Sequence, residues 1–423
     1  MNAVDYIHSL RTFGKKAGLK NIEALLGLVG NPHEGMSFIH VAGTNGKGSV
    51  SSMINSILIA QNKKVGLFTS PFIEYFNERI CINNIPISNS DLERITMRVK
   101  CAVKLLEKDD IYCTVFDVIC AVGFIYFKEC NCDVVVLEVG LGGRFDATNI
   151  IKNPLCTVIC AIGYDHMQYL GNTLEEIAFE KCGTIKENCP VVSYPLQDKS
   201  VAGVISDICT KKNSHLILPD TKELDIKKCD INGSVFNYRG DEYNLKLVGE
   251  YQVYNALCAV EVASYLGIEY SIIKKGIETA MWKCRFEVFK TNDKTIVIDG
   301  AHNSHGISAF LSSADKFFVG KKVHYIFGIL NEKDIDKACS VMAGANGKIT
   351  VTSVPSERCI NPEEVYNLVS INHPETDYIQ DNHQAFKTVV ESDCDVICIL
   401  GSLYMAGEMR KNVEKFSQTD KTI

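Results

Sequence analysis

The most specific chemical signal in the chain is a glycine-rich stretch with a single lysine, residues 43–49 (GTNGKGS). It lies between an apolar run, 38–42, and a stretch from 49 to 61 whose apolar residues recur with helical spacing. In a strand–loop–helix unit of this kind, glycines let backbone N–H groups close around phosphate oxygens at the start of the helix. The lysine, Lys47, would neutralise the β- and γ-phosphates. The stretch therefore predicts ATP binding.

This loop is a variant of the common phosphate-loop pattern, GxxxxGK followed by Ser or Thr. Val41 occupies the position of the first glycine, and Gly48 separates Lys47 from Ser49. The other interpretation is an ordinary glycine-rich turn. Three glycines and a lysine directly before an amphipathic helix favour phosphate binding over that turn.

Polar side chains accompany three further apolar runs at the predicted carboxyl ends of strands. They are Ser70 after the run 65–68, Glu138 within the run 134–139, and His166 after the run 157–162. Ligands bind beyond the carboxyl ends of strands in open α/β sheets, and a carboxylate in so apolar a run is costly unless a cation or partner holds it. A hydroxyl, a carboxylate and an imidazole beside a triphosphate would suit Mg²⁺, which takes few protein ligands. Each residue taken singly also has another interpretation. Glu138 could form a structural ion pair, and His166 could be an ordinary surface or hydrogen-bonded histidine.

A second group of candidate residues lies around residue 290. It consists of Arg285, Asp299, His302 and Asn303, and the last three of these end the apolar run 296–299 or follow it. A nucleotide held between two domains would explain functional groups on both sides of residue 290. Lys181 follows a helix-like stretch, 174–179, and from the residues alone a surface ion pair is the favoured interpretation for it.

The elements that must position these residues alternate along the chain. Short runs rich in Val and Ile are followed by longer helical patterns, which indicates parallel sheets covered by helices. Further buried strands are predicted at 296–299, 323–328, 348–354 and 396–400. Between 215 and 247 the pattern changes to short alternating stretches with turn signals at 232–233 and 239–241, which predicts antiparallel hairpins, and a helix is predicted at 254–266.

We expect an α/β fold with two domains. The first, residues 1–289, would be a phosphate-loop ATPase domain built on a parallel sheet. The second, residues 290–423, would be a smaller Rossmann-like α/β domain.

Length and composition agree with that expectation. A chain of 423 residues with 46% apolar and 22% charged residues is long for one domain and excludes a collagen-like or wholly disordered protein. The 44 Lys and Arg residues against 51 Asp and Glu give a net charge of −7, which argues against a role in coating nucleic acid. No apolar run approaches the about 20 residues of a membrane helix.

Cysteine is unusually frequent, with 18 residues but no CxxC pair and no regular spacing. This pattern predicts neither a zinc site nor a disulfide scaffold, and the first residues lack the basic and apolar regions of a leader. We expect reduced thiols that pack as small apolar side chains in a cytoplasmic protein.

Six motifs, taken in their order along the chain, resemble those of folylpolyglutamate synthases and dihydrofolate synthases, which are ATP-dependent enzymes of the Mur ligase superfamily. They are 43–49 (GTNGKGS), 68–71 (FTSP) with 76–79 (FNER), 137–146 (LEVGLGGRFD), 163–166 (GYDH), 177–181 (IAFEK) and 299–303 (DGAHN). The resemblance extends from about residue 20 to 401–404 (GSLY). It implies that ATP phosphorylates a carboxylate, that the amino group of L-glutamate attacks the acyl phosphate, and that ADP and phosphate leave.

The resemblance also implies roles for individual residues. The nucleotide would be bound by Thr44, Asn45, Gly46, Lys47, Gly48, Ser49, Asn255, Arg285 and Asp299. Magnesium would be held by Ser70, Glu138 and His166, and Lys181 matches a lysine whose carbamate supports a second magnesium in the family. That match replaces the interpretation of Lys181 as a partner in a surface ion pair. Lys47, Lys181 and His302 are the catalytic candidates, and the substrate-binding candidates are Phe72, Arg79, Phe116, Asp117 and Arg144.

Four positions depart from the family's pattern. Asp117 stands for a usual glutamate, Ser304 for a usual proline and Tyr251 for a usual histidine. Cys284 stands for a usual glycine next to Arg285, which puts the backbone geometry of the expected hinge in question.

Two activities share this machinery: joining glutamate to dihydropteroate, and lengthening the glutamate tail of a reduced folate. We expect a bifunctional, monomeric enzyme whose partners are folate or dihydropteroate, L-glutamate and ATP, with no nucleic acid and no membrane. One alternative is another Mur-type amide ligase, but the 42 residues before Gly43 leave little room for the extra N-terminal domain of those enzymes. The other is a nucleotide switch without ligase chemistry, which would place Ser or Thr directly after Lys47.

Overall fold

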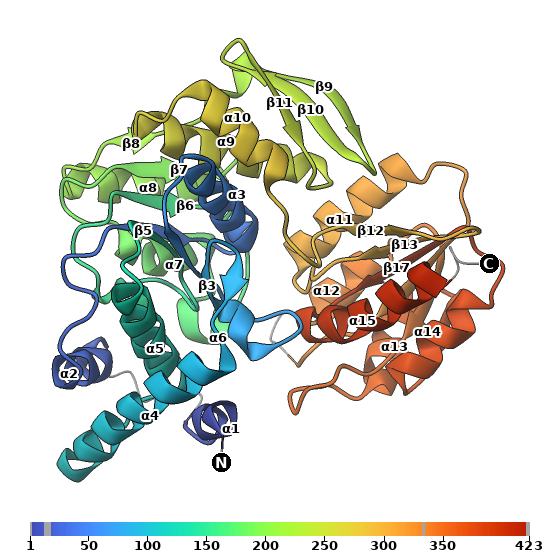
Figure 1. The fold of residues 1–423 in the computed structure, drawn as a ribbon. Coiled ribbons are helices and arrows are strands. Elements are labelled where there is room, and N and C mark those ends of the chain that lie inside the picture. Colours follow the sequence, from blue (N-terminus) through green and yellow to red (C-terminus); the bar gives the residue numbers. More distant parts are fainter. Residues whose placement is uncertain (1, 12–17, 332–334, 420–423) are drawn as a thin grey trace. The chain divides into compact units, whose positions relative to one another are not determined.

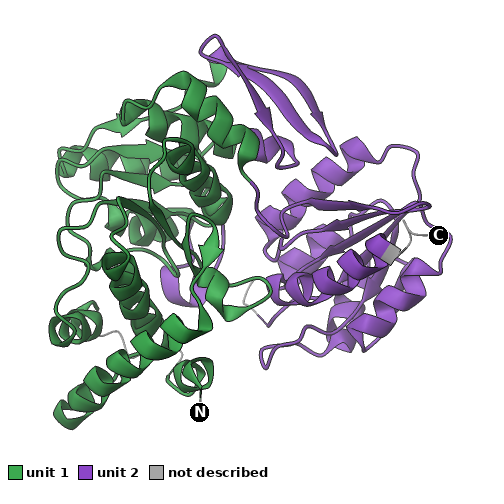
Figure 2. Ribbon diagram, in the orientation of Figure 1, with its two compact units in different colours: residues 1–162, 174–222, 254–280 green, residues 163–173, 223–253, 281–423 purple. Residues whose placement is uncertain are grey.

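The computed structural model describes residues 2–11, 18–331 and 335–419. The chain divides into two compact units (Figure 2), of which the first comprises residues 1–162, 174–222 and 254–280 and the second residues 163–173, 223–253 and 281–423. Two segments that precede residue 254 thus group with the C-terminal part of the chain. A single domain boundary near residue 290 stays a prediction.

The first unit is built on an eight-stranded sheet of order β4-β3-β2-β5-β1-β6-β7-β8 (Figure 1). Its strands are β1 (Phe38–Ala42), β2 (Val65–Phe68), β3 (Ile80–Ile82), β4 (Ile85–Pro86), β5 (Val134–Glu138), β6 (Cys156–Ile159), β7 (Val191–Ser193) and β8 (Leu216–Ile217). The strands from β2 to β8 in that order pair in parallel, and β3 and β4 add an antiparallel edge. The central strands are buried on both faces, as their continuous apolar runs require.

Helices cover both faces of this sheet. They are α1 (Ala3–His8), α2 (Lys20–Leu28), α3 (Lys47–Ala60), α4 (Asn89–Leu106), α5 (Val115–Glu129), α7 (Leu174–Lys181), α8 (Lys199–Lys211), α9 (Glu250–Tyr265) and α10 (Tyr270–Thr279). Helix α9 belongs to this unit from residue 254 on, and its first turn belongs to the second unit. Helices α1, α2, α4 and α5 bury one large apolar cluster against the face that carries Phe38 and Phe68. Helix α3 contacts β1, β2 and β5 and packs against α10 (Figure 1), where a Cβ on Gly276 would lie 2.3 Å from the Cα of Ile57. Glycine therefore sets the close approach of α3 and α10.

The second unit contains a six-stranded sheet of order β12-β13-β17-β14-β15-β16. Its strands are β12 (Glu287–Lys290), β13 (Thr295–Ile298), β14 (Val323–Phe327), β15 (Lys348–Val351), β16 (Thr376–Tyr378) and β17 (Val396–Leu400). All neighbours pair in parallel except β12 with β13. One face packs against α11 (Ser304–Phe317), α12 (Ile335–Met342) and α13 (Pro362–Ser370). Helix α14 (Asn382–Val390) contacts β14, and helix α15 (Leu403–Thr419) contacts β12, β13 and β17. Both sheets confirm the predicted α/β fold with parallel strands.

A three-stranded antiparallel sheet also belongs to the second unit. It consists of β9 (Leu224–Asp230), β10 (Gly233–Tyr238) and β11 (Asp241–Leu245), and Arg239 and Gly240 turn β10 into β11 with positive φ at both positions. The predicted hairpins are thus present, but they begin at Leu224. The two residues of β8, which come after helix α8, instead belong to the first sheet, where they pair in parallel with β7.

Several element ends near the candidate site differ from the sequence predictions, and two of them lie at the phosphate loop and beside it. Helix α3 begins at Lys47 and not at Ser49, because Gly46 adopts a left-handed conformation and serves as its N-cap. Strand β6 ends at Ile159, and residues 160–162 form a loop.

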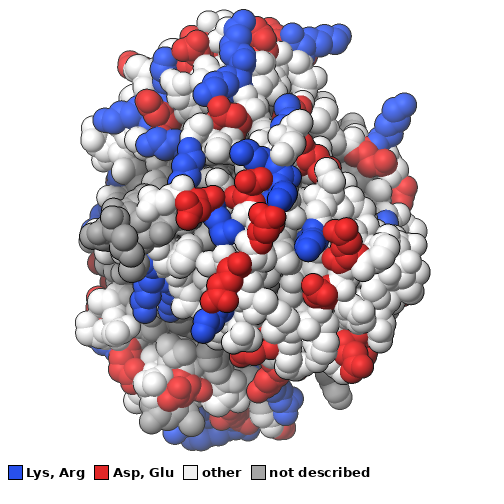
Figure 3. All heavy atoms as spheres, turned by 90° about the vertical axis from the view of Figure 1, so that its right-hand side faces the viewer, with Lys and Arg blue, Asp and Glu red and all other residues white. Residues whose placement is uncertain are grey.

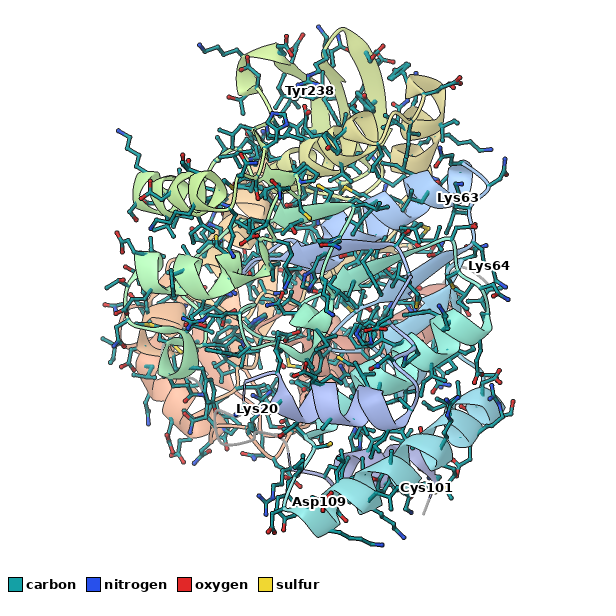
Figure 4. All side chains as sticks on the ribbon, turned by 90° about the vertical axis from the view of Figure 1, so that its left-hand side faces the viewer. Lys20, Lys63, Lys64, Cys101, Asp109 and Tyr238 are labelled. Carbon is teal, nitrogen blue, oxygen red and sulfur yellow. The ribbon has the colours of Figure 1, made fainter. Side chains whose placement is uncertain are left out.

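The cysteines and the surface agree with the composition. All 18 cysteines are free thiols and most are buried, which confirms that they pack as small apolar side chains, whereas Cys101 on α4 is exposed (Figure 4). Acidic and basic side chains are interspersed on the face drawn in Figure 3. With a net charge of −7, an anionic ligand must be attracted by local groups and not by the overall field. None of the described helices is long and apolar enough to cross a bilayer.

Candidate active site

The loop between β1 and α3 is held in place by the neighbouring strand end. The backbone N–H groups of Thr44 and Asn45 both donate to the carbonyl oxygen of Ala161, at 2.9 and 3.0 Å. This carbonyl lies in the loop after β6, the strand next to β1 in the sheet. The adjacent strand end therefore fixes the first half of the loop.

Packing at two glycines leaves no space for a side chain. Gly43 has φ of +144°, and a Cβ there would lie 2.7 Å from the Cβ of Cys160. Gly46 has φ of +86°, and a Cβ there would lie 2.5 Å from Oδ1 of Asn255, a buried residue of α9. Only glycine fits both positions, so the backbone of the loop stays uncovered at the start of α3, as phosphate binding requires. Asn255, a predicted nucleotide contact, is thus placed beside the loop.

Two lysines donate to the carbonyl oxygens of this loop. Lys47 Nζ lies 3.0 Å from the oxygen of Thr44, and Lys181 Nζ lies 2.8 Å from the oxygen of Gly43. Lys181 is only 3% exposed, although it ends helix α7. The surface ion pair considered from sequence is therefore wrong for Lys181, because the lysine is buried under the phosphate loop.

The predicted magnesium ligands fall in both units. Glu138, at the end of β5, is 4% exposed, and its Oε2 accepts a hydrogen bond of 3.1 Å from the backbone N–H of Ser70. The structure thus brings these two residues together in the first unit. His166 belongs to the second unit, where it is the left-handed N-cap of α6 (Met167–Leu170), and its approach to Glu138 stays a prediction. No group of three or more His, Cys, Asp or Glu side chains among the described residues could hold a metal ion by itself.

Loop 140–146 connects the magnesium candidate Glu138 to the substrate candidate Arg144. Asp146 Oδ2 accepts from the backbone N–H groups of Gly140 and Leu141, and its Oδ1 accepts from the N–H and the hydroxyl of Thr148. Burial raises the pKa of Asp146 to about 6, against these four hydrogen bonds that favour the ionised form. Asp146 therefore anchors both ends of the loop.

The side chain of Arg144 is half exposed and lies between two aromatic rings. Its guanidinium carbon is 4.7 Å from the ring centre of Phe145 and 5.4 Å from that of Phe179. Its Nη1 is 3.7 Å from a carboxylate oxygen of Glu180, the residue before Lys181. The backbone of Arg144 is fixed as well, because Asn149 donates to the carbonyl oxygens of Arg144 and Gly183. The loop that carries Arg144 is thus tied to the segment around Lys181.

The remaining substrate candidates lie in two places of the first unit. Arg79 ends the 3₁₀ helix η1 (Phe76–Arg79), and its guanidinium lies 5.2 Å from the ring centre of Phe72. Phe116 lies on α5, and a Cβ on Gly140 would be 2.5 Å from its ring. Asp117 forms a capping box with Thr114 at the start of α5, where one of its oxygens accepts two hydrogen bonds. Burial raises the pKa of Asp117, and capping gives this shorter acid a structural function whether or not it binds substrate.

A buried carboxylate organises the candidate site of the second unit. Asp299, directly after β13, accepts from the N–H groups of Phe286 at 2.6 Å and Ala301 at 2.7 Å. Burial raises the pKa of Asp299, whereas the neighbouring Arg285 acts in the opposite direction. His302 Nδ1 lies 2.8 Å from the oxygen of Gly300, and Asn303 caps helix α11. Arg285, Asp299 and His302 are therefore neighbours, as predicted.

The departures at Tyr251 and Cys284 surround this carboxylate. Burial raises the pKa of Tyr251 well above its usual value, and the charge of Asp299 adds to that effect. Cys284 has φ of +53°, a left-handed conformation in which glycine is the usual residue. Its backbone N–H donates to Glu287 Oε2, and Arg410 forms a two-pronged ion pair with Glu287.

Several organising residues were missed from the sequence. Thr148 and Asn149 hold loop 140–146, and His40, in the middle of β1, lies with Nε2 2.9 Å from the hydroxyl of Thr148. Residues 38–42 carried a usable signal, because a histidine in so apolar a strand needs a partner in the same way as Glu138. Thr148 and Asn149 gave no such signal, since both residue types are common in loops.

Comparisons with known proteins agree with the geometry. Residues 123–263 match the Mur ligase middle domain, and residues 284–403 match the Mur ligase glutamate ligase domain. The dihydrofolate synthase/folylpolyglutamate synthase of Bacillus subtilis is 31% identical over 98% of this chain and 99% of its own length. The folylpolyglutamate synthase of Lacticaseibacillus casei is 33% identical over 97% of both chains.

A solved structure shares the fold over the same extent. The folylpolyglutamate synthase of Mycobacterium tuberculosis, complexed with ADP and AMPPCP, superposes with a TM-score of 0.88 at 27% identity, over 97% of this chain and 98% of that one. Likeness at this level over full length confirms the family expected from the six motifs. The chain therefore belongs to the folylpolyglutamate synthase/dihydrofolate synthase family of ATP-dependent Mur-type ligases.

Proposed function

We propose that this protein uses ATP to join L-glutamate to the carboxylate of a folate-type substrate. The γ-phosphoryl group passes to a carboxylate oxygen, which gives an acyl phosphate and ADP. The amino nitrogen of glutamate then attacks the acyl carbon, phosphate leaves, and the nitrogen loses a proton. The single observation that carries the proposal is the phosphate loop, in which Gly46 packs on Asn255 so closely that only bare backbone can face a ligand.

The roles of the residues follow from the charge of the reacting groups. Backbone N–H groups of residues 44–49 and the ammonium of Lys47 would hold the triphosphate, and Arg285 would add a cation to the nucleotide. Such groups stabilise the charge that develops on a transferred phosphoryl group, so no side-chain nucleophile is needed. On the substrate side we assign Phe72, Arg79, Phe116, Asp117 and Arg144, and in the second unit His302 is our catalytic candidate.

Magnesium would be held by Ser70, Glu138 and His166, and bound magnesium would neutralise phosphate oxygens. A buried carboxylate at a strand end, already bonded to Ser70, fits the oxygen ligands that this ion prefers. A second ion would be held by Lys181 after its amine has combined with carbon dioxide to form a carbamate. The burial of Lys181 beside Gly43 supports this role, since an unmodified lysine is costly to bury.

We further propose that one chain performs both activities of the family, as a monomer in a reducing, cytoplasmic compartment. The test is ADP release with L-glutamate and either dihydropteroate or tetrahydrofolate as acceptor. Turnover with both acceptors supports the bifunctional enzyme. Turnover with tetrahydrofolate alone would reduce the proposal to the polyglutamylating activity.

The carbamate has a separate test. Lys181→Ala is expected to lose most of the ligase activity and to regain part of it when short carboxylates are added, because they can replace the lost oxygen ligands. Lys212→Ala, which removes a half-exposed lysine paired with Glu187, should retain full activity and show no response to carboxylates. Full activity of Lys181→Ala would remove the carbamate from the mechanism.

A further inference from the structure

A chain of three side chains runs from the middle of the first sheet to loop 140–146. His40 is fully buried in β1, and its Nε2 lies 2.9 Å from Oγ1 of Thr148. Thr148 is also fully buried, and its Oγ1 lies 2.5 Å from Oδ1 of Asp146. Neither His40 nor Thr148 has a role in the proposed reaction.

The hydrogen-bond count fixes the direction of this chain. Asp146 accepts three backbone N–H groups, so its oxygens act as acceptors and the single hydrogen of the Thr148 hydroxyl must point to Asp146. Towards His40 the same hydroxyl can then only accept, which places the ring hydrogen of His40 on Nε2. Nδ1 carries no hydrogen, and among the described residues it has no hydrogen-bond partner. Burial lowers the pKa of His40 to about 3, so the ring is neutral at ordinary pH.

The far end of the chain fixes the backbone of the loop. Asp146 Oδ2 accepts from the N–H groups of Gly140, at 3.1 Å, and Leu141, at 2.8 Å. Gly140 packs directly on the ring of Phe116, and Gly143 lies so close to the backbone of residues 180–181 that a Cβ there would be 2.5 Å from the oxygen of Lys181. A rotation of the Asp146 carboxylate would therefore move the loop against Phe116 and change the position of Arg144.

We propose that His40 and Thr148 are positioning residues for the folate-type substrate: they hold the Asp146 carboxylate in the orientation that fixes loop 140–146. The inference rests on the proposed function, because Phe116 and Arg144 are substrate contacts only within it. None of the hydrogen bonds that join His40, Thr148 and Asp146 reaches the phosphate loop. Nucleotide binding should therefore not depend on these hydrogen bonds.

The second unit provides a matched control. His324 Nε2 lies 2.8 Å from Oγ1 of Thr350, and both side chains are buried on neighbouring parallel strands. Within the described part of the chain, no hydrogen bond continues from Thr350 to a carboxylate. Removing either threonine hydroxyl breaks a buried histidine–threonine hydrogen bond. Only at Thr148 does the loss also release a loop of the candidate active site.

The experiment compares Thr148→Val, Thr148→Ser and Thr350→Val in the full-length protein. We expect Thr148→Val to raise KM for the folate-type substrate about tenfold. The dissociation constant for AMPPCP, measured by calorimetry, should stay within about twofold of wild type. Thr148→Ser keeps the hydroxyl and should behave as wild type, whereas Thr350→Val should lower Tm without changing KM. A Thr148→Val protein that loses only thermal stability, as Thr350→Val does, would overturn the proposal.

His40→Gln gives a second readout, because the glutamine amide can donate to Thr148 from nearly the same position as Nε2. We expect it to preserve KM, and we expect His40→Leu to raise KM as Thr148→Val does. Nitrogen NMR of the wild type should show His40 with hydrogen on Nε2, and hydrogen on Nδ1 would contradict the direction of the chain. If wild type forms no glutamylated product, the proposed function fails. If wild type turns over and Thr148→Val matches it, only the positioning inference fails.

Discussion

The phosphate loop of the first unit and residues 284–301 of the second unit both depend on left-handed backbone, but they fill it with different residues. In the loop these positions are Gly43 and Gly46, where neighbouring atoms leave no room for a Cβ. In the second segment they are Cys284, with φ of +53°, and Phe286, with φ of +45°, and both side chains are buried.

The difference reflects what each segment presents to a ligand. A backbone that must face phosphate cannot carry side chains, so glycine is required in the loop. In the second segment the candidate ligand contacts are side chains, and the backbone can adopt a less favourable conformation at a cost of about 1–2 kcal/mol per residue. Carboxylates offset that cost, since Glu287 accepts from the N–H of Cys284 and Asp299 accepts from the N–H of Phe286.

The largest effect should follow from a side chain in the loop itself. Gly46→Ala would place a Cβ 2.5 Å from Asn255 at φ of +86°, so we expect the affinity for AMPPCP to fall at least about 100-fold, or about 3 kcal/mol. Calorimetric titration measures this. Gly203→Ala is the control, because a Cβ on that helical glycine meets nothing within 4 Å and should slightly stabilise the protein. Nucleotide affinity within twofold of wild type in Gly46→Ala would remove the distinction between the two segments.

Asp299→Asn tests whether a carboxylate holds the second segment. The amide can accept from only one of the two backbone N–H groups at full strength, so we expect a loss of about 2 kcal/mol in the free energy of unfolding. Asp381→Asn is the control, since Asp381 caps helix α14 and asparagine caps equally well. Urea unfolding that shows equal stability for the two variants would contradict the anchoring role of Asp299.

A third prediction concerns the pH dependence of the free energy of unfolding, to which the buried histidine of the second unit, His324, contributes. Burial, with smaller contributions from Lys348 and Lys294, lowers the pKa of His324 to about 4. The unfolded chain therefore binds a proton that the folded chain does not, and stability falls as pH decreases below about 6.5. At pH 5 the loss should be about 2 kcal/mol.

His324→Gln should remove that part of the pH dependence, whereas the exposed His215→Gln should not. The measurement is the free energy of unfolding at pH 7.5 and pH 5 for each variant. A pH dependence in His324→Gln as steep as that of wild type would contradict burial of a neutral ring.

The smallest effect is expected at Cys284. Cys284→Gly relieves the left-handed strain but loses a buried thiol, so the free energy of unfolding should change by less than about 1 kcal/mol. Cys398→Gly, in the central strand β17, has no strain to relieve and should cost about 2 kcal/mol. Equal losses in the two variants would show that Cys284 is not strained.

Sequence predicted the strands well where they are continuous apolar runs. Strands β1, β2 and β17 begin and end at the predicted residues, because burial on both faces leaves little freedom in such runs. The start of α3 was predicted two residues late, since the left-handed Gly46 depends on packing against Asn255, more than 200 positions away.

The candidate site was predicted to a similar extent. Motifs and resemblance made Glu138, Lys181 and Asp299 candidates, and the structure places Glu138 and Asp299 at strand ends and Lys181 beside the phosphate loop. Their roles in the reaction stay predictions. The link from His40 through Thr148 to Asp146 could not be predicted, because it depends on which residues the sheet and the loop bring within hydrogen-bond distance. Local pattern gives residue types at strand ends, but not the partners that fix them.

Transfer of a labelled oxygen tests the ligase mechanism most directly. The acceptor carboxylate is prepared with a heavy oxygen isotope and incubated with the protein, ATP and L-glutamate, and the released phosphate and the product are analysed by mass spectrometry. Because the acyl phosphate forms through a carboxylate oxygen, we predict one labelled oxygen in the phosphate that is released when the first glutamyl residue is added. Later additions use the unlabelled carboxylate of the glutamate just added and release unlabelled phosphate. Wholly unlabelled phosphate together with product that has gained one glutamyl residue would contradict the acyl-phosphate route, and phosphate release without glutamylated product would contradict the ligase function.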